Sequence, residues 1–337
     1  MELLKKLTDA FGVSGSECDI AELIKGELEG LGEISVSPLG NVSLHIPGNG
    51  KKILFAAHMD EIGVMARFID DNGFVYISAV GGLSAHTALN SRIRFENGVC
   101  GVLSAGEKKE IKDLKITDMF VDIGAKNKAE AESMISLGMC GKFESNFEIS
   151  GNTIISRVLD NRAGCFALIK AAKELEKCDA DIYFVFTSQE EIGLRGAATA
   201  AYDICPDYAI AVDITDTGDT PDCEKMAVKL GDGPCIKIMD KGIVTNHLVR
   251  DIIETAAKEE NIPYQLEILT AGSTDASMLQ FSCGGIKTGA ISIPLRYIHT
   301  SSEMGNLVDL QNTVKLICAI CKKLCNFEKT IDNCRKI

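Results

Sequence analysis

Histidine and acidic residues follow several apolar segments of this sequence, each at the point where the segment ends. His58 follows the apolar run at 52–57, and strand alternation would aim Asp60, two residues later, to the same side. A carboxylate in that position can fix the tautomer of a metal-bound imidazole. Similar placements recur along the chain, and the candidate residues are His58, Asp60, Asp160, Glu190, Glu191, Asp213 and His299.

Three of these acids have two explanations each. Asp160 opens a D-N-R-A-G segment that leads into an apolar helix, so it is either a helix N-cap or a ligand. Glu190 and Glu191 are adjacent carboxylates after a buried strand. One can bind a metal ion while its neighbour takes a proton from water, although a pair of solvated surface acids is the alternative.

Each remaining candidate residue has more than one explanation when taken alone, but together the candidates indicate a ligand site. Asp213 and His299 each follow an apolar strand, and either one alone could be a hydrogen-bonded core residue. However, open α/β sheets bind ligands at the carboxyl ends of their strands. Histidine and carboxylate side chains gathered there could hold two divalent ions, so we expect two-metal hydrolysis. The segment 272–275 could also face the pocket, or it could cap a helix.

The elements that position these residues follow from hydrophobic patterning. Continuous apolar runs predict strands buried on both faces, at 52–57, 181–187, 208–212 and 289–293. Helical periodicity predicts helices at 3–11, 20–31, 163–176 and 246–260. This alternation is typical of an α/β fold with a mixed, largely parallel sheet flanked by helices.

Residues 69–150 break that rhythm with short strand-like pieces separated by Gly, Asn and Asp. We predict a small β-rich domain there, with one helix at 128–137, inserted into a discontinuous catalytic domain of 1–68 and 151–337.

Composition limits the function classes. The 337 residues are 46% hydrophobic and carry a formal net charge of −13, which favours a folded protein and disfavours nucleic acid as a partner. Neither a signal peptide nor a membrane span is apparent, so we expect a cytoplasmic protein with its 13 cysteines reduced. Cys318, Cys321, Cys325 and Cys334 have metal-like spacing, but the helical periodicity favours packing of the first three thiols on one apolar face.

The sequence resembles the glutamyl aminopeptidase, or tetrahedral aminopeptidase, family of two-metal peptidases, metallopeptidase family forty-two, nearly from end to end. The matching stretches are LLKKLT at 3–8, GVSG at 12–15, AHMDEIG at 57–63, LDNRAG at 159–164, SQEEIG at 188–193, VD at 212–213 and RYIHT at 296–300. The stretch from Gly81 to Glu107 departs from the family pattern.

The resemblance implies a two-zinc exopeptidase fold and the role of each candidate. His58 and Asp213 would hold one ion, Glu191 and His299 the other, and Asp160 would bridge both. Glu190 would be the general base and Asp60 would orient His58. The implied substrates are short peptides, the ions are zinc or else cobalt or manganese, and the small domain would build dimers and possible dodecamers. A catalytically idle peptide-binding subunit and a glycoside hydrolase are the alternatives.

Overall fold

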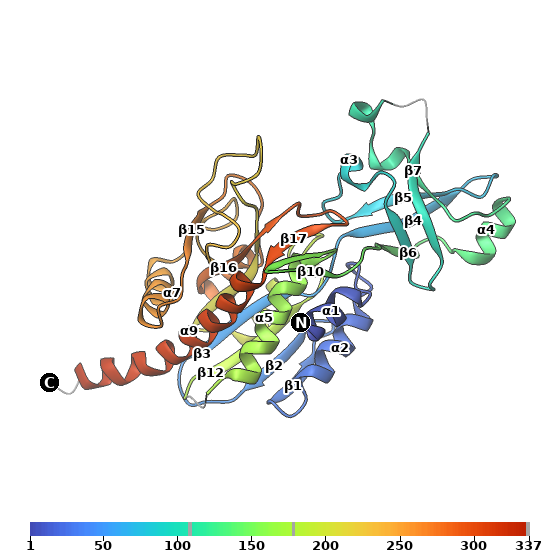
Figure 1. Cartoon of the computed structure of the whole chain (residues 1–337). Helices are drawn as coiled ribbons and strands as arrows, with labels where there is room; N and C mark the ends of the chain where they lie inside the picture. The colour runs from blue at the N-terminus through green and yellow to red at the C-terminus, as the bar shows by residue number, and fades with distance from the viewer. Residues whose placement is uncertain (107–109, 177–178, 335–337) are drawn as a thin grey trace.

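The computed structural model describes residues 1–106, 110–176 and 179–334. A large α/β part carries most of the chain, and a smaller β-rich part projects from one end of it (Figure 1). The last helix, α9 (Leu307–Cys334), crosses the large part and extends beyond it toward the C-terminus. Among the helices within residues 1–106, 110–176 and 179–334, none combines the length and the apolar character needed to cross a bilayer.

The large part is built on a mixed sheet in which four parallel strands lie at the centre, in the order β12, β3, β13, β16. These are the four strands predicted from apolar runs. Antiparallel strands extend the sheet on both sides. The strands are β1 (Glu33–Val36), β2 (Val42–Ile46), β3 (Lys52–His58), β10 (Glu148–Ser150), β11 (Thr153–Ser156), β12 (Asp181–Thr187), β13 (Tyr208–Thr215), β14 (Cys235–Met239), β15 (Gln265–Ile268), β16 (Lys287–Arg296) and β17 (Glu303–Asn306).

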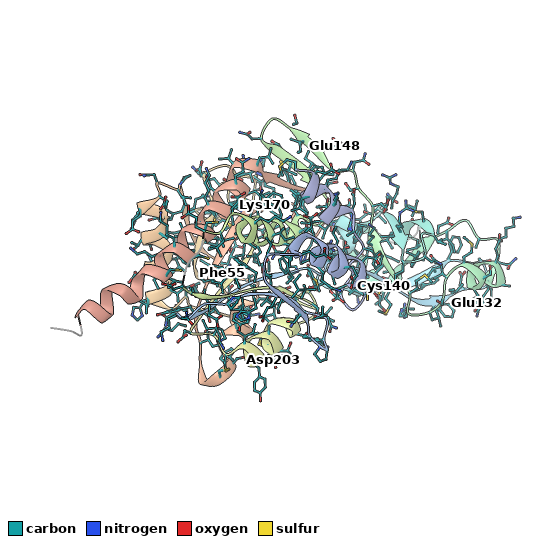
Figure 2. All side chains as sticks on the ribbon, turned by 90° about the horizontal axis from the view of Figure 1, so that it is seen from below. Phe55, Glu132, Cys140, Glu148, Lys170 and Asp203 are labelled. Carbon is teal, nitrogen blue, oxygen red and sulfur yellow. A yellow bond between two sulfur atoms is a disulfide. The ribbon has the colours of Figure 1, made fainter. Side chains whose placement is uncertain are left out.

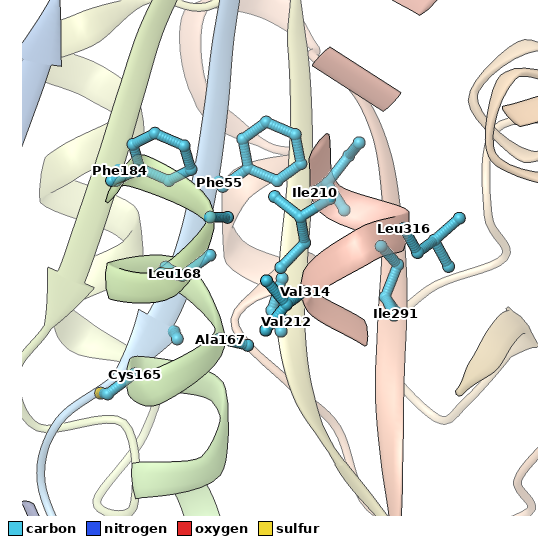
Figure 3. Close-up of a cluster of buried hydrophobic side chains, with 14 of the residues drawn as sticks. Phe55, Cys165, Ala167, Leu168, Phe184, Ile210, Val212, Ile291, Val314 and Leu316 are labelled. Carbon is cyan, nitrogen blue, oxygen red and sulfur yellow. The ribbon is translucent and has the colours of Figure 1, made fainter. Parts of the chain in front are cut away.

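Helices cover both faces of this sheet. Successive side chains of a strand point to opposite faces, so the continuous apolar strands place apolar side chains on both faces, and helices bury them. Phe55 of β3 packs with Phe184, Leu168 and Val314 on one face, which α1, α2, α5, α7 and α9 cover (Figure 3). Leu54 and Ala56 point to the other face, against small residues of α6 and α8. The helices are α1 (Glu2–Asp9), α2 (Cys18–Leu28), α5 (Leu159–Glu174), α6 (Arg195–Ile204), α7 (His247–Glu259) and α8 (Ala276–Leu279).

The small part is a closed barrel with its own hydrophobic core, and its strand order is β4-β5-β8-β7-β6-β9. Its elements are β4 (Gly63–Ile69), β5 (Val75–Val80), α3 (Ala85–Ala88), β6 (Arg92–Phe95), β7 (Cys100–Ala105), η1 (Ile111–Asp113), η2 (Ile116–Asp118), β8 (Met119–Asp122), α4 (Lys128–Met134) and β9 (Cys140–Phe143). Glu107, which ends the stretch that departs from the family pattern, lies outside the described residues.

The barrel strands span 63–143, where the sequence predicted an insert over 69–150. These bounds differ because strand pairing assigns β4 to the barrel at one end and β10 to the large sheet at the other. β4 pairs with β5 and β9 inside the barrel, whereas β10 pairs with β11 of the large sheet. In a view from below, Cys140 of β9 lies nearer to the large part than Glu132 of α4, which marks the distal end (Figure 2).

The oxidation state of the cysteines differs from the prediction. Cys205 and Cys283 form a disulfide, with their Cα atoms 5.9 Å apart, so the expectation that all thiols are reduced is wrong here. The bond joins the end of α6 to the turn η3 (Ser282–Gly284), which are distant in sequence and gave no spacing signal. In α9, Cys318, Cys321 and Cys325 pack against the hydrophobic core as predicted, but Cys325 is also disulfide-bonded, and the side chain of Cys334 is outside the described part.

Candidate metal centre

The parallel strands bring the candidate residues to one edge of the sheet. His58 ends β3 and lies opposite Thr187, the last residue of β12, which the two adjacent glutamates follow after a short turn. Asp213 lies near the end of β13, and His299 follows β16. Since all four strands run in the same direction, their carboxyl ends meet and the side chains gather there.

Asp160 lies between the two histidines, and each of its carboxylate oxygens faces one imidazole. Oδ1 is 3.1 Å from Nε2 of His58, and Oδ2 is 3.2 Å from Nε2 of His299. Asp213 Oδ1 is 3.6 Å from Nε2 of His58, and Glu191 Oε1 is 3.3 Å from Nε2 of His299. A tetrahedral ion with bonds of about 2.0–2.2 Å holds its ligands about 3.3–3.6 Å apart, so these spacings suit such an ion.

Two overlapping sets of three donors lie within 4.8 Å in the described residues, and His58 belongs to both. One set adds Asp160 and Glu191, and the other adds Glu190 and Asp213. Glu190, expected to be a base, therefore lies as close to His58 and Asp213 as a ligand would. This position also suits a group that exchanges protons with water bound beside an ion.

Asn161, and not Asp160, caps α5. The N–H of Gly164 donates to Asn161 Oδ1 at 3.0 Å, and the Asn161 side-chain amide donates to the carbonyl of Val212 at 2.8 Å. A Cβ at position 164 would lie 2.2 Å from Asn161 Oδ1, which explains the glycine. The capping alternative for Asp160 is therefore excluded, because its carboxylate faces the histidines.

Asp60 is fully buried and connects three segments of the site. Its Oδ1 accepts from the N–H of Glu190 at 3.0 Å, and its Oδ2 accepts from the N–H of Glu191 at 3.2 Å and from Ser14 Oγ at 2.5 Å. His58 Nδ1 is 3.2 Å from the Asp60 carbonyl oxygen and 3.5 Å from Oδ1. Asp60 therefore lies beside His58, as the two-residue spacing predicted.

Carboxylates outnumber cations at this edge of the sheet. Burial and the neighbouring acids Asp213 and Asp275 raise the pKa of Glu190 well above its usual value, although His58 opposes them. Burial lowers the pKa of His299, but Asp160 and Glu191 outweigh it and raise the value to about 12. Such a surplus of buried negative charge is what divalent cations offset.

Two further acids of the site escaped the sequence prediction. Glu303 is buried and accepts from the N–H groups of Asp160 at 2.9 Å and of His299 at 3.0 Å, so it fixes the backbone of both. Asp275 is buried and accepts from Thr187 Oγ1, while its other oxygen has no partner. The sequence left open whether the segment 272–275, which includes Asp275, faces the pocket or caps a helix, and no spacing signal marks Glu303.

The backbone around the site is strained at several non-glycine residues. His299 itself has φ 59°, a left-handed conformation that costs a non-glycine residue about 1–3 kcal/mol. The other examples near the site are Val158, Gln189, Leu194 and Tyr297. Strain of this kind persists where the surrounding contacts fix the conformation, as the hydrogen bond from His299 to Glu303 does here.

A cavity of about 760 Å³ opens directly onto the candidate ligands. His58, Asp160, Glu190, Glu191, Asp213 and His299 line one end of it. The segments after β13 and after β15 line much of the rest. A volume of this size accommodates a few residues of an extended peptide beside the acids and histidines.

Comparison with known proteins now identifies the family. A profile of the M42 glutamyl aminopeptidases matches residues 40–316. The chain belongs to this family. It is therefore a peptide hydrolase, a metal-dependent aminopeptidase, and the resemblance seen in the sequence is confirmed.

Relatives of this M42 chain align with it over nearly their full lengths. A protein named putative aminopeptidase, from Acetivibrio thermocellus, is 50% identical over 95% of this chain and 98% of its own. A lysyl aminopeptidase from Pyrococcus furiosus is 37% identical over 96% of this chain and 97% of its own.

Solved structures of M42 relatives have the same fold. An aminopeptidase from the archaeon Desulfurococcus kamchatkensis gives a TM-score of 0.92 at 36% identity, covering 96% of this chain and 94% of that one. The TET1 peptidase of Pyrococcus horikoshii, described as assembling into a tetrahedron or a large octahedral shell, gives 0.87 at 33% identity over 95% and 98%. A structure named endoglucanase, from Thermotoga maritima, gives 0.82 at 30% over 96% and 98%.

Proposed function

We propose that this M42 aminopeptidase removes N-terminal residues from short peptides by two-metal hydrolysis. The observation that carries the proposal is the placement of Asp160, whose two oxygens face different imidazoles at 3.1 and 3.2 Å. A carboxylate presented in this way suits a bridging ligand between two cations. The surplus of buried acids supplies the negative charge that two cations would offset.

His58, Asp160 and Asp213 would hold one cation, and Asp160, Glu191 and His299 would hold the other. Bound divalent ions lower the pKa of water and polarise a carbonyl oxygen, which is the chemistry that peptide hydrolysis needs. Glu190 is the general base: it takes a proton from the attacking water and returns it to the leaving amine. Asp60 is a positioning residue, since it orients His58 and the backbone of both glutamates.

Zinc is the ion that we propose first, with cobalt or manganese as the alternatives. Histidine nitrogen and carboxylate oxygen are a mixed donor set that suits each of these ions. The described cysteine thiols belong to neither donor set, so a soft, thiolate-rich site does not describe this centre.

The experiment is reconstitution of chelated full-length protein with one divalent ion at a time, followed by assay on chromogenic aminoacyl substrates. We expect about two ions per chain and release of the N-terminal residue only when they are bound. Metal content is measured by mass spectrometry on the same samples, and the assay without ions is the control.

Two results of this experiment would support the alternatives. Stoichiometric metal with no release of N-terminal residues would favour an idle peptide-binding subunit. Cleavage of a glucan that continues after chelation would favour a glycoside hydrolase. The two-histidine donor set speaks against the latter, because paired carboxylates alone carry glycoside hydrolysis.

We also propose that the protein is a homo-oligomer built from dimers, up to a dodecamer, with the barrel as its assembly domain. The support is the similarity to the TET1 peptidase, whose structure is described as a tetrahedral or octahedral assembly. Light scattering coupled to gel filtration measures the mass, and a monomer at micromolar concentration would contradict the proposal.

A further inference from the structure

The cavity extends well beyond the candidate ligands, between two loops. Residues that follow β13 form a first wall, and residues that follow β15 form a second wall. Thr270 of the second wall donates to Glu224 of the first at 2.7 Å, so the two loops are tied together beside the cavity. Side chains of these loops are placed to contact the first residue of a peptide bound at the metal centre.

Two acids of the first wall lack a cationic partner. Asp216 and Glu224 both line the cavity, and neither forms an ion pair with a lysine or arginine of the described residues. They lie close enough to interact: burial raises the pKa of Asp216, and the charges of Asp160 and Glu224 add to that effect, while His299 opposes it. Asp216 and Glu224 therefore share one cavity with the metal centre and repel one another.

The basic residues of the lining do not offset these acids. Lys237 is fully buried and forms ion pairs with Glu267 and, at 3.5 Å, with Asp240. This triad of one lysine and two acids therefore has one more acid than base. Arg296 donates to both oxygens of Asp219, at 3.0 and 2.7 Å.

One lysine of the rim remains. Lys225 borders the cavity with an exposed side chain, next to Glu224 in sequence. Asp216 and Glu224 are exposed like Lys225, but this single cation does not balance two acids together with the acidic surplus of the buried triad. Apart from the candidate ligands, the cavity walls therefore keep a negative charge.

Two buried hydroxyl groups of the cavity lining have no partner and are free to accept a hydrogen bond from a ligand. Thr215 and Thr274 line the cavity, are 1% and 6% exposed, and have side-chain oxygens without any partner. Thr215 is on the same face of β13 as Asp213, because the two are separated by one residue of a strand. A buried hydroxyl without a partner costs free energy, which a bound ammonium or guanidinium group would recover.

We propose that the side-chain pocket beside the metal centre selects peptides whose N-terminal residue is lysine or arginine, with Asp216 and Glu224 as the specificity-determining acids. This inference builds on the proposed aminopeptidase function and adds the substrate class. The substrate cation supplies the partner that both acids lack, and a substrate with an acidic first residue meets repulsion from the same wall.

The test uses the metal-loaded, full-length enzyme and substrates that differ only in charge. Lysine is compared with norleucine, arginine with citrulline, and glutamate is included, each as the aminoacyl p-nitroanilide. We expect kcat/KM for lysine to exceed that for norleucine at least ~10-fold, because the lysine ammonium group forms a close ion pair in a partly enclosed site. Since salt screens such a pair, we expect the ratio to fall as salt is added. An equal ratio, or a preference for glutamate, would overturn the inference.

Variants assign the selectivity to the two acids. Asp216→Asn and Glu224→Gln should each reduce the lysine-to-norleucine ratio several-fold, and the double variant should reduce it further. Asp222→Asn is the matched control, since Asp222 is exposed on the same loop and outside the cavity lining. Ratios that stay within twofold of the parent in both single variants would overturn the assignment. Loss of the proposed function would look different, because then the metal-loaded parent would release no residue from any substrate, which would overturn both proposals.

Discussion

The carboxylate of Asp60 accepts a hydrogen bond of 3.0 Å from the main-chain N–H of Glu190, the proposed base. The same carboxylate accepts from the N–H of Glu191, and it lies 3.5 Å from the ring of His58. One buried acid thus contacts both the proposed ligand at the end of β3 and the segment after β12, which are distant in sequence. Burial raises the pKa of Asp60, but the hydrogen bond and charge of His58 outweigh it, and the net pKa is lowered.

Asp60→Asn should therefore weaken both metal binding and turnover while the fold persists. Loss of an outer carboxylate partner of a metal-bound histidine costs about 10- to 100-fold in metal affinity or activity. Metal affinity is measured by competition with a chromogenic chelator, and activity is measured at saturating metal. Ser14→Ala, which removes only the hydroxyl that donates to Asp60, is the control and should have a smaller effect. Unchanged metal affinity and kcat in Asp60→Asn would disprove the positioning role.

Glu190→Gln and Glu191→Gln should separate the base from the ligand. Removing a general base costs about 10² to 10⁴ in rate, so Glu190→Gln should keep its metal and lose most of kcat. Glu191→Gln should lose metal, because Glu191 lies 3.3 Å from the ring of His299 as a ligand would. Metal content and kcat are measured on both variants. Full activity of Glu190→Gln would remove the assignment of this residue as the base.

Removal of the metal ions should lower the unfolding temperature. The buried acids repel one another without cations, and an ion present at 100 times its Kd stabilises the folded chain by ~2.7 kcal/mol per site. Calorimetry with and without a chelator should show a decrease of several degrees that zinc reverses. Asp160→Asn provides the comparison, since loss of the shared carboxylate should shrink the difference. Equal melting temperatures in the parent with and without chelator would argue against resident cations.

Local patterning predicted the central strands well. β12 was predicted with both of its ends correct, and the core of β3, β13 and β16 was predicted from continuous apolar runs. Those strands are buried on both faces, so their composition is constrained along the whole length. The barrel boundary was less predictable, because β4 and β10 are short segments whose assignment depends on which strands they pair with.

Apart from Asp160, which lies at the start of α5, the candidate ligands could be picked out in the sequence because they lie at or just after the carboxyl ends of those strands, whereas their outer partners could not. Glu303 contacts Asp160 and His299 through their backbone N–H groups, and such contacts leave no spacing pattern. Asn161 and Asp160 were equally suitable caps in sequence, and only the fold showed which one caps α5. The disulfide between Cys205 and Cys283 joins elements 78 residues apart, a distance at which sequence gives no geometric information.

A buried lysine connects the barrel to the large part of the molecule. Lys142 of β9 is 7% exposed, and its Nζ donates to the carbonyl of Asp9 at 2.5 Å. Burial, followed by the charge of Arg157, lowers the pKa of Lys142 to about 8 from 10.5, while Glu61 and Glu144 act in the opposite direction. The folded protein therefore releases this proton at a lower pH than the unfolded chain does.

Stability linked to Lys142 should consequently rise with pH. Between about pH 8 and 10.5 the unfolded chain binds a proton that the folded chain has released, so raising the pH favours the folded state. The difference in unfolding free energy between the parent and Lys142→Met should then increase by ~2–3 kcal/mol across this range. Urea denaturation at several pH values measures it, and Lys126→Met, at an exposed position of the barrel, is the matched control variant. A difference that stays flat or falls with pH would mean that Lys142 keeps its proton in the folded protein, and the contact with Asp9 would then be that of a charged donor at all these pH values.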